Sequence, residues 1–321
     1  MRYKETEMKI LLVIDGSSYS EMATRMLKAL HLPSGTAVTV LTVVPETTFL
    51  GGVTLDVIRG VSQSRKKAKE EQQRKAAELL QGTAQVLTES KLEVDTLVHW
   101  GNPAELILWE AEERNTSLIV MGAKGLTDPL AFRLGSVAQT VMKYARASVL
   151  LVRNRPAAAE LTHVRKETAA INRVLLAADG SKYSEAVIKF LLELPLPRHC
   201  EVIIMTALQS HLMAWVKTPT LDFNTNQELL SRLQTAEEAE AHNITAKAEK
   251  QFQNKGYRTA SVVIRGGAGE SILAAAREYK PDIIALGSRG LSGLEALLLG
   301  SVAERVARYA DCSVLIGRVV K

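Results

Sequence analysis

The sequence predicts an α/β protein built from two tandem, doubly wound domains, each with a five-stranded parallel sheet. Three observations support this fold class: a repeat of domain length, alternation of strand-like and helix-like segments within each copy, and continuous apolar runs typical of strands buried on both faces. At 321 residues the chain is long enough for two domains that each bury a core.

The repeat can be read directly from the residues. The segment 10–21, ILLVIDGSSYSE, returns at 174–185 as VLLAADGSKYSE, and the endings SVLLVR (148–153) and SVLIGR (313–318) also correspond. Solenoid repeats are about 20–50 residues long, so the much longer period here indicates duplication of a whole domain. We therefore expect a first copy at 1–155, a linker at 156–170 and a second copy at 171–321.

The first half of each copy follows from local signals, taken here from the first copy. The apolar run 9–14 predicts a buried strand, and Ser17 or Ser18 can cap the helix that follows it to residue 30. A second strand is expected at 36–44. Charged and apolar residues at helical spacing then predict a long helix at 63–87.

The second half continues the alternation. A third strand is expected at 94–99, and Asn102 followed by Pro103 is typical of a helix start. The remaining elements are a strand at 117–121, a helix at 136–145 and a strand at 148–152. The segments 45–62 and 208–226 do not follow this rhythm and differ between the copies, so we interpret both as variable excursions between the second strand and its helix.

The composition excludes several classes of function. No apolar run approaches the roughly 18 residues that span a bilayer, and the charged segment 1–7 does not resemble a signal peptide, so we expect a cytoplasmic protein without a membrane partner. The net charge is only +5, and the densest charged stretch, 65–75, mixes both signs as a solvated helix face does, so no nucleic-acid partner is expected.

The cysteines and histidines predict no metal or redox centre. Cys200 and Cys312 lie far apart, and the six histidines are scattered without paired spacing. We expect two buried or idle thiols.

Short polar turns follow the first and fourth strands. In open α/β sheets, ligands bind beyond the C-terminal ends of the strands, where neighbouring connections leave in opposite directions. Asp15-Gly-Ser and Gly122-Ala-Lys-Gly125 stand at such positions, and they recur as Asp179-Gly-Ser and Gly287-Ser-Arg-Gly290. This coincidence predicts one ligand site in each copy.

The chemistry of these turns suits a phosphate chain. Glycines let a ligand approach the main chain, and Gly135-Ser136 opens a helix whose unpaired N–H groups favour an anion. Lys124 can offset phosphate charge, while Asp15 can accept hydrogen bonds from ribose hydroxyls or help to hold a metal. The same spacing, Gly-x2-Gly-x9-Gly-Ser, ends at Gly300-Ser301 in the second copy.

Each piece also has a purely structural explanation when it is seen alone. A Gly-x-x-Gly is usually a turn, a serine before a helix is usually a cap, and Asp-Gly-Ser after a strand is commonly a capped turn. The prediction depends on all of them occurring together, twice, at fixed spacing. The loop is not of the Walker type, because the chain contains no Gly-x4-Gly-Lys-Ser/Thr.

At these residues the sequence resembles the universal stress protein family in tandem form. The family's ATP-binding signature is Gly-x2-Gly-x9-Gly-Ser/Thr with an aspartate after the first strand, and both copies match it. The resemblance covers nearly the whole chain apart from the linker and the two excursions. It implies a Rossmann-like fold, similar to the adenine nucleotide alpha hydrolases, that binds ATP with Mg²⁺.

The resemblance also implies a role for each site residue. The aspartate would contact the ribose, Val43 would hold adenine through its backbone with Ala207 as its counterpart, and the glycine loop would cradle the phosphates. The implied nucleotide-binding residues are Asp15, Val43, Gly122, Lys124, Gly125, Gly135, Ser136 and Val137 in the first copy, and Asp179, Ala207, Gly287, Arg289, Gly290, Gly300, Ser301 and Val302 in the second.

The first copy departs from the family pattern at 127–129. Pro129 stiffens that stretch and Asp128 adds a negative charge near the phosphates, so we expect the second site to be the more reliable binder. Single-domain members of the family commonly dimerise through their last strands. This implies that 149–152 and 314–316 pair as an intramolecular pseudo-dimer, with homo-oligomers and regulatory protein partners left open.

These observations favour a cytosolic ATP-binding regulatory protein of the stress response. No general base or nucleophile is associated with the Gly-Ser loop, so a weak Mg-dependent ATPase is the second hypothesis. A nucleotide-free dimerisation scaffold is the third. An alpha-hydrolase or adenylyl transferase is remote, because the His-x-Gly-His and Ser-Gly-Gly-x-Asp-Ser patterns are absent.

Overall fold

The computed structural model describes residues 8–45, 55–126, 134–153, 170–208, 223–291 and 299–319. In the first copy the elements are β1 (Ile10–Val13), α1 (Ser18–Ala29), β2 (Ala37–Val44), α2 (Leu55–Thr88), β3 (Glu93–Trp100), α3 (Pro103–Glu113), β4 (Leu118–Gly122), α4 (Ser136–Tyr144) and β5 (Ser148–Val152). In the second copy they are β6 (Arg173–Ala177), α5 (Lys182–Glu193), β7 (Glu201–Leu208), α7 (Phe223–Asn254), β8 (Arg258–Arg265), α8 (Ala268–Tyr279), β9 (Ile283–Gly287), α9 (Ser301–Tyr309) and β10 (Ser313–Gly317).

Helix starts follow the capping residues that the sequence contains. Ser17 caps α1 by accepting a hydrogen bond from the backbone of Ser20, and Ser181 caps α5 in the same way. Asn102 caps α3 with Pro103 in its first turn.

The long helices begin earlier than predicted. α2 starts at Leu55 and α7 at Phe223, so the ends of both predicted excursions are helical. The remainder of those excursions, 46–54 and 209–222, lies outside the described residues. The prediction was wrong there because propagation of an existing helix adds a hydrogen bond for each residue, which the irregular hydrophobic pattern does not reveal.

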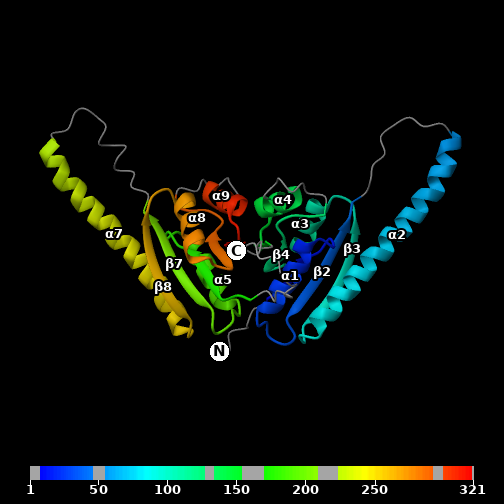
Figure 1. Cartoon of the computed structure of the whole chain (residues 1–321), viewed down its shortest axis with the longest axis horizontal. Coiled ribbons are helices and arrows are strands. Elements are labelled where there is room, and N and C mark those ends of the chain that lie inside the picture. The colour runs from blue at the N-terminus through cyan, green and yellow to red at the C-terminus, as the bar shows by residue number, and fades with distance from the viewer. Residues whose placement is uncertain are drawn as a thin grey trace, which may run out of the picture.

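The two copies share a single sheet of ten strands, in the order β3-β2-β1-β4-β5-β10-β9-β6-β7-β8. Each copy contributes five parallel strands, as predicted, and the strands of the two copies meet where β5 and β10 pair antiparallel, with Leu150 opposite Leu315. The predicted intramolecular pairing of the last strands is confirmed. Figure 1 shows the two halves flanking this junction, with α2 and α7 at the outer edges slanting away from each other.

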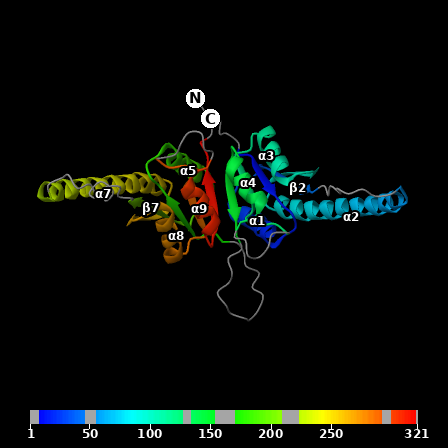
Figure 2. The same ribbon diagram turned by 90° about the horizontal axis from the view of Figure 1, so that it is seen from above.

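Helices cover both faces of the sheet, and each face has its own core. On one face, α1, α2, α5 and α7 pack on alternate strand residues such as Leu12 and Leu176. On the other face, α3, α4, α8 and α9 pack on residues such as Leu11 and Leu175. Figure 2 shows the same halves from above, with α4 and α9 beside the central strands. Both cores run through both copies, because the sheet is continuous.

The junction is reinforced beyond the strands. Arg153 donates to the carbonyl oxygen of Ala307 at the end of α9 (2.5 Å), and Arg318 donates to that of Met142 near the end of α4 (2.5 Å). The backbone N–H of His31 also donates to the carbonyl of Pro195 (2.9 Å). Each copy therefore holds the other through matching contacts.

Of the helices in the described ranges, none combines the length and apolar character that crossing a membrane requires.

Candidate functional site

The aspartate after the first strand fixes the turn on which the site is built. In the first copy, Asp15 Oδ1 accepts from the backbone N–H of Ser17 (3.0 Å), and Oδ2 accepts from that of Leu126 (3.0 Å). Asp179 makes the same two contacts, with Ser181 (3.0 Å) and Leu291 (3.1 Å). Each carboxylate thus joins the loop after the first strand to the loop after the fourth.

The glycines at the site serve different purposes from those that the pattern suggests. Positive φ angles fall at Gly16 (81°) and Gly180 (75°), directly after the aspartates. A Cβ added at Gly122 would lie 2.7 Å from the Cβ of Tyr19, so this glycine is required by the close approach of α1 to β4. Gly287 has the same relation to Tyr183, whose carbonyl carbon would lie 2.7 Å away.

The start of α4 is presented to a ligand without a side-chain cap. Gly135 is the N-cap residue and, having no side chain, makes no side-chain cap hydrogen bond to the first N–H groups of this helix. Its own N–H donates to the carbonyl of Ala123 (2.8 Å), which anchors the helix start to the end of β4. Gly300 does the same with Ser288 (2.7 Å) at the start of α9. Such helix starts favour an anion.

A cavity of about 520 Å³ opens at this place in the first copy. It lies beyond the C-terminal ends of β1, β2 and β4, where the strand order reverses between β1 and β4. Its volume falls within the usual range of small-ligand sites. Seven of the eight residues predicted for the first copy line it: Asp15, Val43, Gly122, Lys124, Gly125, Ser136 and Val137. The eighth, Gly135, directly precedes Ser136.

The sequence argument missed the contribution of α2. This helix contributes four residues to the cavity lining: Gln72, Lys75, Ala76 and Leu79. Other elements contribute Thr42, Pro45 and Ile107, which the sequence argument also missed. The sequence did contain a signal for this contribution. The predicted long helix follows the strand that carries Val43, so one face of that helix must pass the ends of the strands.

The second copy repeats the hydrogen-bonded frame with a different cation. Arg289 stands in the place of Lys124 and donates through Nη1 to the hydroxyl of Tyr183 (2.7 Å). Its guanidinium also lies over the Tyr183 ring, 5.1 Å from the centroid. Ser301 is exposed, while Ala207 and Val302 are half-buried at the corresponding strand and helix ends.

The remaining predicted features are placed as follows. Both cysteines are buried and free, as expected, and burial raises the pKa of the Cys200 thiol to about 12. Within the described ranges, no three His, Cys, Asp or Glu side chains are grouped in a way that could hold a metal ion. Residues 127–129, on which the expected difference between the sites depends, lie outside the described residues.

Five parallel strands whose order reverses at a switch point, with helices on both faces, define a doubly wound α/β domain, present here twice. The universal stress protein family matches at residues 8–153 and 170–318, so the chain belongs to this family.

Known relatives agree with this assignment. Universal stress protein YxiE of Bacillus subtilis is 28% identical over 153 residues, which span 46% of this chain and 99% of YxiE. A universal stress protein of Methanocaldococcus jannaschii is 38% identical over 89 residues, spanning 28% of this chain and 51% of that protein. The crystal structure of a universal stress protein from Archaeoglobus fulgidus covers 97% of this chain and 96% of its own, at 20% identity and a TM-score of 0.59. That likeness shows the fold of the whole two-copy arrangement.

Proposed function

We propose that this chain is a nucleotide-binding regulatory protein that holds ATP at the strand ends of its copies. The observation that carries the proposal is the first-copy cavity, which joins the uncapped start of α4 to the ends of β1 and β2. The phosphates would lie at Gly135 and Ser136, where the helix N–H groups and Lys124 supply positive charge. The second copy offers the same frame through Gly300 and Ser301.

The other end of the cavity suits a base and a ribose. Val43 lies near the end of a strand at the cavity wall, where its backbone would meet the polar edge of a purine, and Ile107 and Leu79 supply apolar surface. Asp15 already accepts two backbone hydrogen bonds, but a carboxylate has further lone pairs to offer to ribose hydroxyls.

Magnesium would arrive with the nucleotide. Mg²⁺ is usually held by one or two carboxylates together with substrate phosphates, and Asp15 is a carboxylate that lines the cavity. The regulatory output would then be a change in the exposed loop at Leu126, whose backbone is bonded to Asp15.

The proposal is tested by native mass spectrometry of the purified chain, followed by calorimetric titration with Mg-ATP. The informative variants are Ser136→Glu and Ser301→Glu, because a carboxylate there repels the phosphates while a glutamate in the first helical turn suits the helix dipole. We expect each to weaken ATP binding at its own site by about 10- to 100-fold, with the fold retained in circular dichroism.

Gln139→Glu is the matched control. It adds the same charge one turn further along α4, where Gln139 is exposed and does not line the cavity, so ATP binding should be nearly unchanged. A wild-type chain that carries no nucleotide and shows no heat with Mg-ATP would contradict the proposal and favour the scaffold hypothesis.

A further inference from the structure

The helices α2 and α7 occupy equivalent positions, and the contacts establish their register. Leu79 lies 3.7 Å from a Cβ built at Gly16, and Ile244 lies 3.0 Å from one built at Gly180. The buried positions agree, with Ala76 and Leu80 of α2 matching Ala241 and Thr245 of α7. A residue of α2 therefore corresponds to the residue 165 positions later in α7.

This register places opposite charges beside the two sites. Lys75, which lines the first cavity, corresponds to Glu240, and Gln72 corresponds to Glu237. Lys75 also contacts Glu71 (3.4 Å), but that carboxylate is held at shorter distance by Arg74 (2.7 Å), and the pairs are exposed. The ammonium group of Lys75 is thus available to a ligand phosphate.

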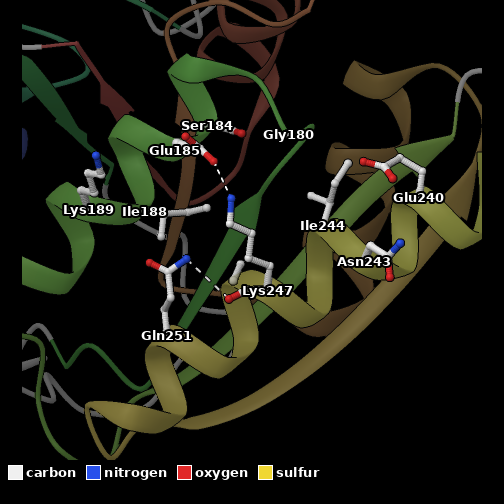
Figure 3. Close-up of a pocket in the computed structure, with 11 residues that line it drawn as sticks. Gly180, Ser184, Glu185, Ile188, Lys189, Glu240, Asn243, Ile244, Lys247 and Gln251 are labelled. Carbon is white, nitrogen blue, oxygen red and sulfur yellow. Dashed lines mark hydrogen bonds and ion pairs between the residues drawn. The ribbon is translucent and has the colours of Figure 1, made fainter.

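Glu240 lies beside the turn of the second site. Together with Gly180, Asn243 and Ile244 it lines a groove of about 370 Å³ between α5 and α7. Figure 3 shows Glu240 on the same stretch of α7 as Asn243 and Ile244, with the Gly180 turn opposite. Gly180 directly follows Asp179, so Glu240 stands near the turn that carries the aspartate of the second site. The groove also contains Lys189 and Lys247, and Lys247 is paired with Glu185 (2.8 Å).

Arg289, the cation in the glycine loop of the second copy, does not fully offset the negative charge that Glu240 brings in place of Lys75. Arg289 is oriented by its hydrogen bond to Tyr183 and by the aromatic ring beneath it. Turning toward a phosphate would give up both contacts, which lowers the net gain from binding a polyanion.

We infer that the two sites take ligands of different charge. The first binds a nucleoside polyphosphate most tightly, whereas the second binds the polyphosphate more weakly and favours a nucleoside or a nucleoside monophosphate. This inference rests on the proposed function and deepens it. Residues 127–129 suggested that the second site binds more reliably. For polyphosphates the inference gives the opposite order, because Lys75 of α2 favours the first site and Glu240 of α7 disfavours the second.

The test uses the full chain with one site blocked at a time. In the Ser301→Glu background, calorimetric titration of the first site should give affinities that rise from AMP to ADP to ATP. In the Ser136→Glu background, the second site should show no such rise. Lys75→Glu should weaken ATP binding at the first site by about 3- to 10-fold, and Glu240→Lys should strengthen it at the second by a similar factor, both less so at high salt.

The neighbouring positions supply matched controls, and adenosine supplies a neutral ligand. Gln73→Glu and Ala239→Lys change the charge at exposed positions that do not line the cavity or the groove, so each should have a smaller effect than its partner. Adenosine binding should not respond to any of these charge changes.

Two results would overturn the inference in distinguishable ways. Equal phosphate dependence at both sites, with no effect of Glu240→Lys, would refute the charge argument and leave the proposed function intact. Absence of binding of every adenine ligand at both sites would refute the proposed function itself.

Discussion

At the scale of single residues, the first copy contains a buried polar cluster that the second copy lacks. Glu110 is 5% exposed, and its carboxylate contacts His99 Nε2 (2.8 Å) and the guanidinium of Arg114, which also donates to Thr39 (3.1 Å). Burial pushes the pKa of Glu110 upward, but the hydrogen bonds from Arg114 and His99 outweigh burial and hold that pKa below its ordinary value.

The second copy replaces this cluster with Ile264, Ala275 and Tyr279 at the positions of His99, Glu110 and Arg114. Without Glu110, His99 and the buried side of the Arg114 guanidinium lose their shared acceptor, while Arg114 keeps its contact with Asp95 (2.8 Å). We therefore predict that Glu110→Ala destabilises the chain by roughly 1–3 kcal/mol. The triple change to the second-copy residues should cost less than the single one. Chemical denaturation of both variants measures the difference.

The pH dependence of the stability of Glu110→Ala tests whether the ionised carboxylate of Glu110 stabilises the folded state. A carboxylate with a lowered pKa stabilises the folded state above its ordinary pKa, and this stabilisation is lost as the pH falls through the lowered value. The difference in the free energy of unfolding between wild type and Glu110→Ala should therefore be constant near neutral pH and shrink in acid. A gap that does not change with pH would show that lost packing alone explains the effect.

At the scale of elements, close approach of helices to strand ends explains several glycines. A Cβ added at Gly317 in β10 would lie 2.5 Å from the Cβ of Val187 in α5. Val152, its counterpart in the first copy, is buried, so the α1–β5 contact tolerates a side chain that the α5–β10 contact does not. The packing distance of one helix therefore determines which residue the strand can use.

We predict that Gly317→Ala destabilises the chain by about 1–3 kcal/mol, because α5 must move to admit the methyl group. Gly82→Ala is the control, since Gly82 lies within α2 and an added Cβ meets nothing within 4 Å. That change should stabilise by roughly 0.5–1 kcal/mol through helix propensity. Thermal unfolding followed by circular dichroism distinguishes the two, and a neutral Gly317→Ala would contradict the packing argument.

At the scale of the whole molecule, the junction makes one continuous sheet of two ligand-binding units. Arg318 is buried. Its pKa is lowered to about 10, mainly by desolvation and secondly by the nearby charge of Arg289. Its contact with the last carbonyls of α4 places a cation at the negative end of that helix, and Arg153 does the same for α9. Each arginine therefore connects one copy to the helix, α4 or α9, that follows the glycine loop of the other.

We predict that Arg153→Ala and Arg318→Ala together loosen the junction, each costing about 1–3 kcal/mol because a helix carbonyl loses a charged donor. Wild type should unfold in a single calorimetric transition, and the double variant in two. Hydrogen exchange should rise selectively in β5 and β10. A single unshifted transition in the double variant would show that strand pairing alone holds the copies together.

The resemblance to the universal stress protein family implied the pairing of the last strands. The residues alone determined the duplicated α/β fold and the residues of the glycine loops. Those features depend on local patterns, such as apolar runs, cap residues and glycine spacing, which recur in both copies and are legible without the fold. Only the tertiary structure decided which face of α2 lines the cavity and that Glu240 takes the position of Lys75 on α7. It also showed that Gly122 and Gly287 are needed by helix packing. These contacts join residues far apart in the chain, and their geometry is set by how closely each helix packs on the sheet.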